Sequence, residues 1–336
     1  MKDNKSDKNN FHLYLLSGIV VLIILFFVSM CTGRYKIPVA SVFKYFTFHQ
    51  IDFVSQRVIQ YLRIPRTLIA ILVGASLAVS GAIYQSVFNN KLVSPDLLGV
   101  SSGASVGACF AILLGFTKFF VSISALLFGF LAVLLTMVIA RIFRNKNNVI
   151  LLLCGLATSG FMSSLVGLMK YLADDDRKLA EMTFWLLGDI SAATMNDFYR
   201  LLPVFIIAVA VACCLAWQLN ILSLGEKEAK SLGVNYHLYF GILILIATLL
   251  TAFSVSISGT IGWIGLVIPN MVRLLIGSNN KKVIPVSIFA GAIMMLFVDM
   301  LARSLAPNEI PLSVITGILG TPLFIFSIYK KRKEIQ

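Results

Sequence analysis

The chain has 336 residues, of which 58% are hydrophobic and only 13% are charged, and its mean hydropathy is +0.90. Soluble domains are about 45–50% apolar and about 25% charged, so this composition excludes an ordinary water-soluble protein. Helices in lipid satisfy their own backbone hydrogen bonds, and we therefore predict an all-α integral membrane protein. The net charge of +13 does not indicate nucleic-acid binding, because the basic residues lie between apolar segments rather than on one soluble face.

A membrane-spanning helix needs about 20 mostly apolar residues, and ten apolar runs approach or reach this length. In chain order they are Phe11–Met30, Thr67–Phe88, Leu97–Phe116, Phe119–Ile142, Val149–Leu172, Leu201–Trp217, Tyr236–Ser256, Ile264–Ile276, Val283–Leu305 and Leu312–Tyr329. The eighth run is short, so it either crosses fully or is broken and partly re-entrant. We predict a single transmembrane permease domain, residues 1–336, of about ten transmembrane helices.

Ten crossings place both termini on one side of the membrane. Lys and Arg favour cytoplasmic loops. With the N-terminus inside, the inner segments hold sixteen basic residues and the outer segments twelve. The bias is modest, and the short inner loops and the C-terminal KKRK decide it. We predict that both termini are cytoplasmic and that residues 1–10 form a short cytoplasmic tail.

One outer segment leads into an unusually long helix. From Phe53 to Phe88 the only strong helix breaker is Pro65, which predicts a helix of about 36 residues and about 54 Å. Its first part must project from the membrane or lie in the interface, and Pro65 is expected to kink or start the membrane part. Arg63 and Arg66 share one helix face. Either they anchor the helix at the interface, or, with Arg303, they receive carboxylates of a partner.

Glycines in the third span recur every four residues, at Gly99, Gly103 and Gly107. Small residues at this spacing let helix backbones approach closely in a membrane. We interpret them as a helix-packing face, with direct contact to a transported molecule as the alternative.

The segment Leu219–Val234, LNILSLGEKEAKSLGV, is a polar island between two apolar spans, with the pattern E-x-x-A-x-x-x-G. The chain has no GxxxxGK[ST] phosphate loop. These two features predict a cytoplasmic loop that receives energy from a separate ATPase. The three histidines are scattered and form no metal or catalytic cluster, so neither an enzyme nor a bound cofactor is predicted. Few ionisable residues lie deep in the spans, which disfavours the rival, an ion-coupled secondary transporter.

Two stretches of the chain resemble a known family. RIPRTLIAILVGASLAVSGAIYQSVFNNKLVSPDLLGVSSGASVGA, at Arg63–Ala108, is similar to the signature of FecCD-type permeases, the membrane subunits of ABC importers for iron-siderophores, haem and cobalamin. The second stretch carries LNILSLGEKEAKSLGV, SGTIGWIGLVIPNMVRLLIG, VDMLARSL and EIPLSVITGILGTPLFI in the family's order. The sequence departs from the family where Lys91 replaces a usual Pro, Asn270 a usual His and Trp263 a usual Phe.

The resemblance implies a non-catalytic subunit in the cytoplasmic membrane of a bacterium. It implies a second permease subunit, identical or homologous, two ATPase subunits that carry ATP and Mg, and an outer substrate-binding protein. It also implies that Arg63, Arg66 and Arg303 face glutamates of the binding protein. The residues expected to couple to the ATPase are Leu224, Gly225, Glu226, Ala229, Leu232 and Gly233. The expected cargo is a ferric siderophore, and haem, cobalamin and molybdate are the alternatives.

Overall fold

The computed structural model describes residues 3–143 and 148–335, and the regular structure in these residues is entirely helical. The elements are α1 (Asp3–Cys31), α2 (Val39–Phe46), α3 (Phe53–Arg57), η1 (Val58–Arg63), α4 (Ile64–Val87), η2 (Pro95–Leu98), α5 (Val100–Leu113), α6 (Lys118–Ile142), α7 (Asn148–Tyr171), α8 (Asp176–Leu186), α9 (Met195–Cys214), α10 (Ala216–Leu222), α11 (Glu226–Ser231), α12 (Tyr236–Ser258), α13 (Ile264–Ile276), α14 (Asn280–Ala302) and α15 (Leu312–Ile335). Within the described residues, eight helices are long and apolar enough to cross a membrane, and α5 and α13 are shorter apolar helices.

The predicted apolar runs therefore coincide with helices, apart from shifts of a few residues at their ends and three further differences. The third run does not start as one helix at Leu97, because η2 ends at Gly99, whose φ is +83°, and α5 begins only at Val100. The sixth run divides into α9 and the short α10. Helix α1 already begins at Asp3, so most of the predicted tail is helical, and Met1 and Lys2 lie outside the described residues.

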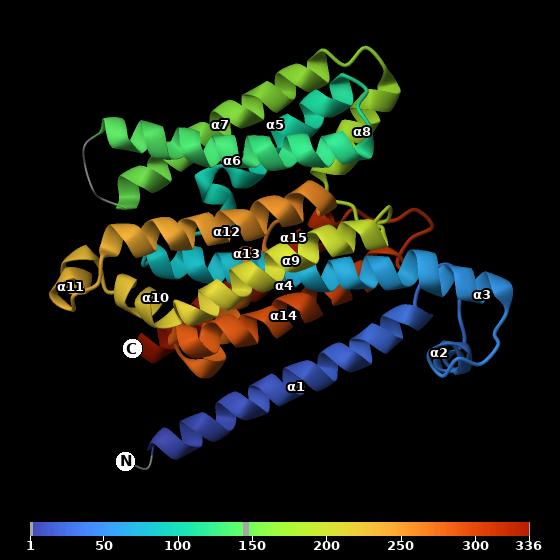
Figure 1. Cartoon of the computed structure of the whole chain (residues 1–336), viewed down its shortest axis with the longest axis horizontal. Helices are drawn as coiled ribbons and strands as arrows, with labels where there is room; N and C mark the ends of the chain where they lie inside the picture. Colours follow the sequence, from blue (N-terminus) through green and yellow to red (C-terminus); the bar gives the residue numbers. More distant parts are fainter. Residues whose placement is uncertain (1–2, 144–147, 336) are drawn as a thin grey trace.

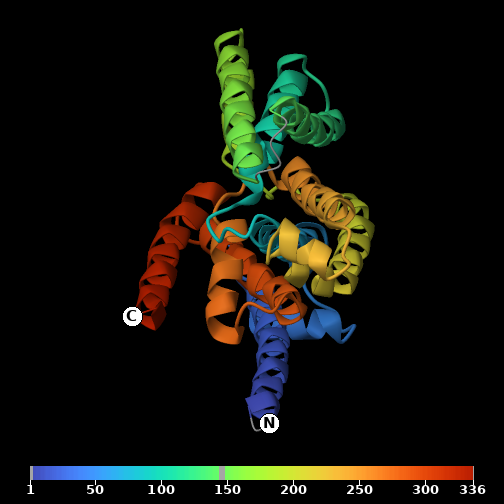
Figure 2. The same cartoon turned by 90° about the vertical axis from the view of Figure 1, so that its left-hand side faces the viewer.

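Helix α4 runs through the middle of the bundle, where it packs against α12, α13 and α14 (Figure 1). Helices α6 and α7 lie on one side of this centre and α1 on the opposite side (Figure 2). Close packing around α4 depends on glycine. Gly74 lies against the Gly291 backbone of α14, and Gly81 lies against the Gly265 backbone of α13, with no room for a Cβ. These contacts hold α14 and the shorter α13 against the central helix.

The two ends of the bundle differ. Helix α11, the start of α1 and the end of α15 lie at one end, and α2, α3 and α8 lie at the other (Figure 1). This arrangement agrees with the prediction that both termini share one side. Arg144 and Lys146, which contributed to the predicted charge bias, lie outside the described residues.

The predicted long helix is present, since α3, η1 and α4 form one continuous helical segment from Phe53 to Val87. Its middle part, η1, is a π-helix that ends two residues before Pro65. A proline ring clashes with the carbonyl one turn earlier and removes one backbone hydrogen bond. The wider π turn gives the chain a way to pass this proline without ending the helix.

Helices η2 and α13 meet beside the C-terminal part of α4. Pro95, the first residue of η2, lies against Gly265 of α13, where a Cβ would lie 2.8 Å from Pro95 Cδ. Gln85 of α4 donates from Nε2 to the Leu266 carbonyl at 3.1 Å.

Candidate functional site

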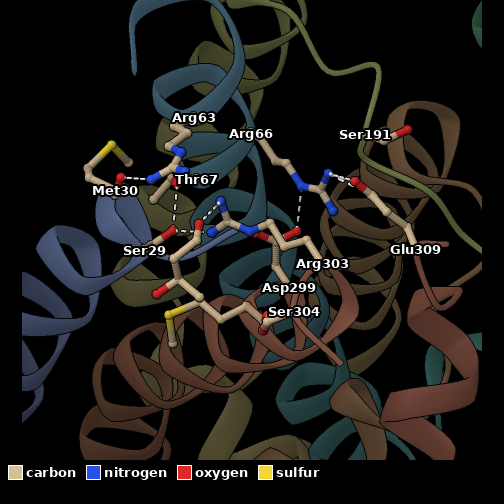
Figure 3. A network of polar contacts seen from close by, with 12 residues as sticks. Ser29, Met30, Arg63, Arg66, Thr67, Ser191, Asp299, Arg303, Ser304 and Glu309 are labelled. Carbon is tan, nitrogen blue, oxygen red and sulfur yellow. Dashed lines mark hydrogen bonds and ion pairs between the residues drawn. The ribbon is translucent and has the colours of Figure 1, made fainter. Parts of the chain in front are cut away.

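A buried charge network (Figure 3) joins the start of α4 to the end of α14, at the end of the bundle opposite α11 (Figure 1). Arg66 Nε donates to Asp299 Oδ1 at 2.6 Å, and Arg66 Nη1 lies 2.8 Å and 3.0 Å from the two carboxylate oxygens of Glu309. Arg303 Nε lies 3.1 Å from Asp299 Oδ2, an ion pair without hydrogen-bond geometry. The side chain of Asp299 is fully buried, whereas that of Glu309 is 32% exposed. Asp299 therefore joins two helix ends through two guanidinium groups.

Arg63 belongs to the same region but faces the end of α1. Its guanidinium donates to the Met30 carbonyl oxygen (Figure 3) and also to the Tyr35 carbonyl oxygen. Arg303 reaches the same helix end, donating from Nη2 to Ser29 Oγ at 2.5 Å and from Nη1 to the Thr32 carbonyl at 3.2 Å. Arginine suits this position because its planar fork satisfies several acceptors at once.

The structure brings the three predicted arginines together, but it does not leave them exposed. Arg63, Arg66 and Arg303 are 4%, 7% and 5% exposed, and each pairs within its own chain. Arg63 and Arg66 also have different partners rather than forming a single fork. The signal for Asp299 was its i, i+4 spacing with Arg303 in the sequence; Glu309 carried no such signal.

The segment between α9 and α12 folds as two short helices, α10 and α11, at the opposite end of the bundle (Figure 1). Ala229 is fully buried on one side of α11, and Glu226 pairs with Lys230 at 2.7 Å. By contrast, Leu224 and Leu232 are 58% and 57% exposed. Two apolar side chains are therefore exposed at this end of the bundle.

Two glycines bound α11. Gly225 precedes it with φ +114°, and Gly233 follows it with φ +74°. Gly233 forms the turn that follows this short helix, and a Cβ placed on it meets no atom within 4 Å. Glycine is favoured at Gly233 by its left-handed backbone.

A chain of polar side chains connects this loop to the bundle, and sequence reasoning missed it. Asn220 of α10 donates to Asn279 Oδ1 at 2.9 Å and accepts from the Asn280 backbone at 2.8 Å. Ser86 of α4 donates to Asn280 Oδ1 at 2.9 Å, and Arg273 of α13 donates to Ser86 Oγ at 3.0 Å. The start of α14 therefore bonds directly to the loop, and Ser86 and Arg273 extend the network to α4 and α13.

The glycine motif divides into two roles. A Cβ on Gly103 would lie 2.5 Å from Ala132 Cβ and from the Phe128 carbonyl of α6, and Gly107 lies against the Ser124 carbonyl of the same helix. These two glycines pack α5 against α6. Gly99 differs, since it lies before α5 in the left-handed region, with ordinary contacts to α6 and α7.

Two of the three departures from the family pattern contact each other. Asn270 Nδ2 donates to the Lys91 carbonyl at 2.9 Å and to the Leu266 carbonyl at 2.8 Å. The bond uses only the Lys91 backbone, so a proline there would offer the same acceptor. Trp263 stands before α13 with φ +71°, and its side chain packs on Gly320 of α15.

Comparison with known proteins gives concordant matches over nearly the whole chain. Residues 21–330 match the FecCD transport family. The chain is 38% identical over 324 residues to the molybdate import system permease protein MolB of Haemophilus influenzae, covering 95% of this chain and 96% of that protein. It is 34% identical over 330 residues to the Fe(3+) dicitrate transport system permease protein FecC of Escherichia coli, covering 95% and 98%. A solved inward-facing structure assigned to the metal-chelate type of ABC transporter matches with a TM-score of 0.85 and 38% identity, covering 94% of this chain and 98% of that one.

Proposed function

Because the chain belongs to the FecCD transport family of ABC importer permeases, we propose that it carries a ferric siderophore through the membrane. As such a permease it is a non-catalytic, multi-pass subunit of the bacterial inner membrane that works with an ATPase and a binding protein. Iron chelates are the cargo named for several relatives, including the FecC protein and an iron chelatin permease of Helicobacter pylori, 35% identical over 275 residues. Molybdate is the second candidate, because MolB is 38% identical over 95% of this chain.

The loop of α10 and α11 is proposed to receive the ATPase at the cytoplasmic side. Its support is a buried anchor at Ala229 beside the exposed Leu224 and Leu232, an arrangement that fixes the loop and presents apolar side chains to a partner. Because Asn220 bonds to the start of α14, a displacement of the loop by the ATPase would be transmitted to that helix. This orientation also places both termini in the cytoplasm.

Docking of the binding protein is proposed at the opposite end, through exchange of carboxylates. Arg66 already holds Glu309, whose side chain is 32% exposed, so a partner carboxylate reaches Arg66 only by replacing Glu309. Arg63 and Arg303 keep their bonds to the end of α1 in this scheme. The second permease subunit and the paired ATPase subunits complete the proposed assembly.

The isosteric variant Glu309→Gln tests the docking proposal, because it removes the carboxylate charge and keeps the size of the side chain. Removing the internal competitor is expected to raise the affinity of the binding protein by about two- to fivefold, the range of one exposed ion pair. Affinity is measured for the complex in nanodiscs at low and high salt. An unchanged affinity at both salts rejects Arg66 as a docking residue.

Transport itself is tested by reconstituting the chain with its ATPase and binding protein in proteoliposomes. ATP-dependent uptake of a ferric siderophore, with no uptake driven by ion gradients alone, is the expected result. If the proteoliposomes take up molybdate and not the siderophore, molybdate is the cargo.

A further inference from the structure

Helix α2 lies across the direction of the membrane-spanning helices, just beyond the end of α1. Figure 1 views it close to its own axis, whereas α1 and α4 run across the picture. One face of α2 is fixed to the protein by Val42, which is buried in a cluster with Met30 of α1 and Ile59 of η1. An amphipathic helix in this orientation is typical of the membrane–water interface.

The opposite face of α2 is apolar and uncovered. Val39 and Phe43, one turn apart, are 68% and 66% exposed. Phe46 continues this face, and the centre of its ring lies 5.5 Å from that of Phe27 on α1. Phe27 is itself exposed on α1, a helix long and apolar enough to cross the membrane. The apolar face of α2 is therefore continuous with a surface that meets lipid.

Phe48 follows α2 at a backbone position that usually belongs to glycine. Its φ is +59°, its N–H donates to the Tyr45 carbonyl at 3.2 Å, and the next N–H donates to the Lys44 carbonyl at 2.9 Å. These two hydrogen bonds form a Schellman motif. A bulky residue rarely adopts this left-handed backbone, and Phe48 is also 98% exposed. Because neither the backbone nor packing within the chain favours phenylalanine here, the ring indicates a partner outside the chain.

Basic side chains surround this apolar surface. Between residues 32 and 62 the only acidic residue is Asp52, which caps α3 by accepting from the Ser55 backbone at 3.1 Å. Four exposed basic residues of the same segment form no ion pair within the described part of the chain: Arg34, Lys36, Lys44 and Arg57. Lys and Arg usually favour cytoplasmic loops, so uncompensated positive charge at the proposed outer end indicates an anionic partner.

An open groove of about 680 Å³ lies between the end of α2 and α3. Its lining includes the rings of Phe48 and Phe53 and the side-chain amides of Gln50 and Gln56. The guanidinium carbon of Arg57 lies 4.5 Å from the centre of the Phe53 ring, so a positive charge borders the groove. Amide and guanidinium groups donate hydrogen bonds to phosphate oxygens, and the rings offer an apolar surface to the adjoining glycerol and acyl chains.

We propose that α2, the turn at Phe48 and α3 form an anchor for anionic phospholipid in the outer leaflet. The apolar face of α2 and the Phe48 ring enter the boundary of the acyl chains, and Lys44 and Arg57 receive headgroup phosphates. The choice of leaflet rests on the orientation given under the proposed function, whereas the lipid class rests on charge and exposure alone. Since α3, η1 and α4 form one continuous helical segment, the anchor also holds the outer end of the central helix.

The first test measures lipid binding to the purified full chain in detergent by native mass spectrometry. The probes are dioleoylphosphatidylglycerol, which is anionic, and dioleoylphosphatidylcholine, which carries no net charge. Lys44→Gln combined with Arg57→Gln is expected to lower the affinity for phosphatidylglycerol by about fivefold or more, since each Lys or Arg at an anionic lipid surface contributes about that factor. The affinity for phosphatidylcholine is expected to stay unchanged.

Lys118→Gln combined with Arg177→Gln is the matched control. It removes two positive charges near α8, at the same end of the bundle. Lys118 lies 3.7 Å from Asp197, and Arg177 follows three aspartates at 174–176, so neither position attracts an anion. The control is expected to bind both lipids like the wild type. Equal affinity of the control and the Lys44 and Arg57 variant for phosphatidylglycerol overturns the proposal.

The variant Phe48→Trp tests the apolar part of the anchor in a bilayer. The full chain is reconstituted in vesicles of phosphatidylglycerol and brominated phosphatidylcholine, and the emission that the variant adds to the wild-type signal is measured. Bromolipid is expected to quench this emission more strongly than aqueous acrylamide does. Phe184→Trp is the control on α8, where Phe184 is 61% exposed and shares a polar pocket with Glu181 and Asp189. The opposite order of quenching is expected there.

Stronger quenching of Phe48→Trp by acrylamide than by bromolipid overturns the proposal. Protection of this variant from acrylamide by added binding protein also overturns it, because the surface then serves a protein partner. Neither measurement requires transport. A negative result therefore rejects the lipid anchor and leaves the proposed transport function to its own test.

Discussion

Asp299 is the residue on which the buried charge network depends. Its side chain is fully buried and lies 2.6 Å from Arg66 Nε and 3.1 Å from Arg303 Nε. Asp299→Ala removes the only acidic partner of Arg303 in the described part of the chain and one of the two acidic partners of Arg66. Asp299→Ala therefore leaves the buried guanidinium of Arg303 with only neutral hydrogen-bond acceptors, Ser29 and Thr32.

The expected loss of folding free energy depends on how deeply each carboxylate is buried. Breaking a buried ion pair by removing one partner costs about 3–5 kcal/mol, since the remaining charge stays away from water. Glu309 is about a third exposed, so Glu309→Gln is expected to cost only about 0–1 kcal/mol. The exposed Glu181 of α8 supplies a surface control, and Glu181→Gln is expected to stay within about 0.5 kcal/mol of wild type.

Reversible unfolding in mixed micelles with increasing SDS measures the three variants on one scale. The expected order of destabilisation is Asp299→Ala, then Glu309→Gln, then Glu181→Gln. A loss for Asp299→Ala that is no larger than that for Glu309→Gln refutes the reasoning, because it means that the arginines do not need a buried counter-charge.

Three further predictions concern local geometry. Gly103→Leu is expected to force α5 from α6 and to lower the yield of folded protein in size-exclusion chromatography, whereas Gly160→Leu, with open space at its Cβ, is expected to give a normal yield. Gly233→Val is expected to weaken co-purification of the ATPase, because the left-handed backbone costs about 1–2 kcal/mol; Gly233→Asn, which tolerates that backbone, is expected to retain it. Asn270→Ala removes bonds to two carbonyls and is expected to lose about 1–3 kcal/mol in the SDS titration, a loss that Asn270→Asp does not restore.

Much of the helical framework follows from the sequence because lipid imposes a simple length rule. The apolar runs predict the helices, and α13 has the bounds expected for it. Helix α8 was missed because its composition is polar; its signal is Asp175, whose side chain caps the helix by accepting from the Arg177 backbone.

The candidate sites follow from the sequence less completely, for a physical reason. The motif places the arginines near one another, but their burial depends on acceptors contributed by distant residues, such as Met30 and Glu309. The exposed face of α2 likewise depends on the burial of Val42 against Met30 and Ile59, which only tertiary packing brings together. Local spacing does not determine either result.

The π-helix before Pro65 has a further consequence for engineering this chain. A π turn is equivalent to one residue inserted into an α-helix, so the segment Val58–Arg63 carries a surplus residue. Deleting one residue there restores α-helical register and turns everything on its N-terminal side by about 100° relative to α4. Helix α3, with Asp52 capping it, then faces another direction, while the membrane part keeps its packing. The direction in which α3 faces therefore depends on one extra residue in the π-helix.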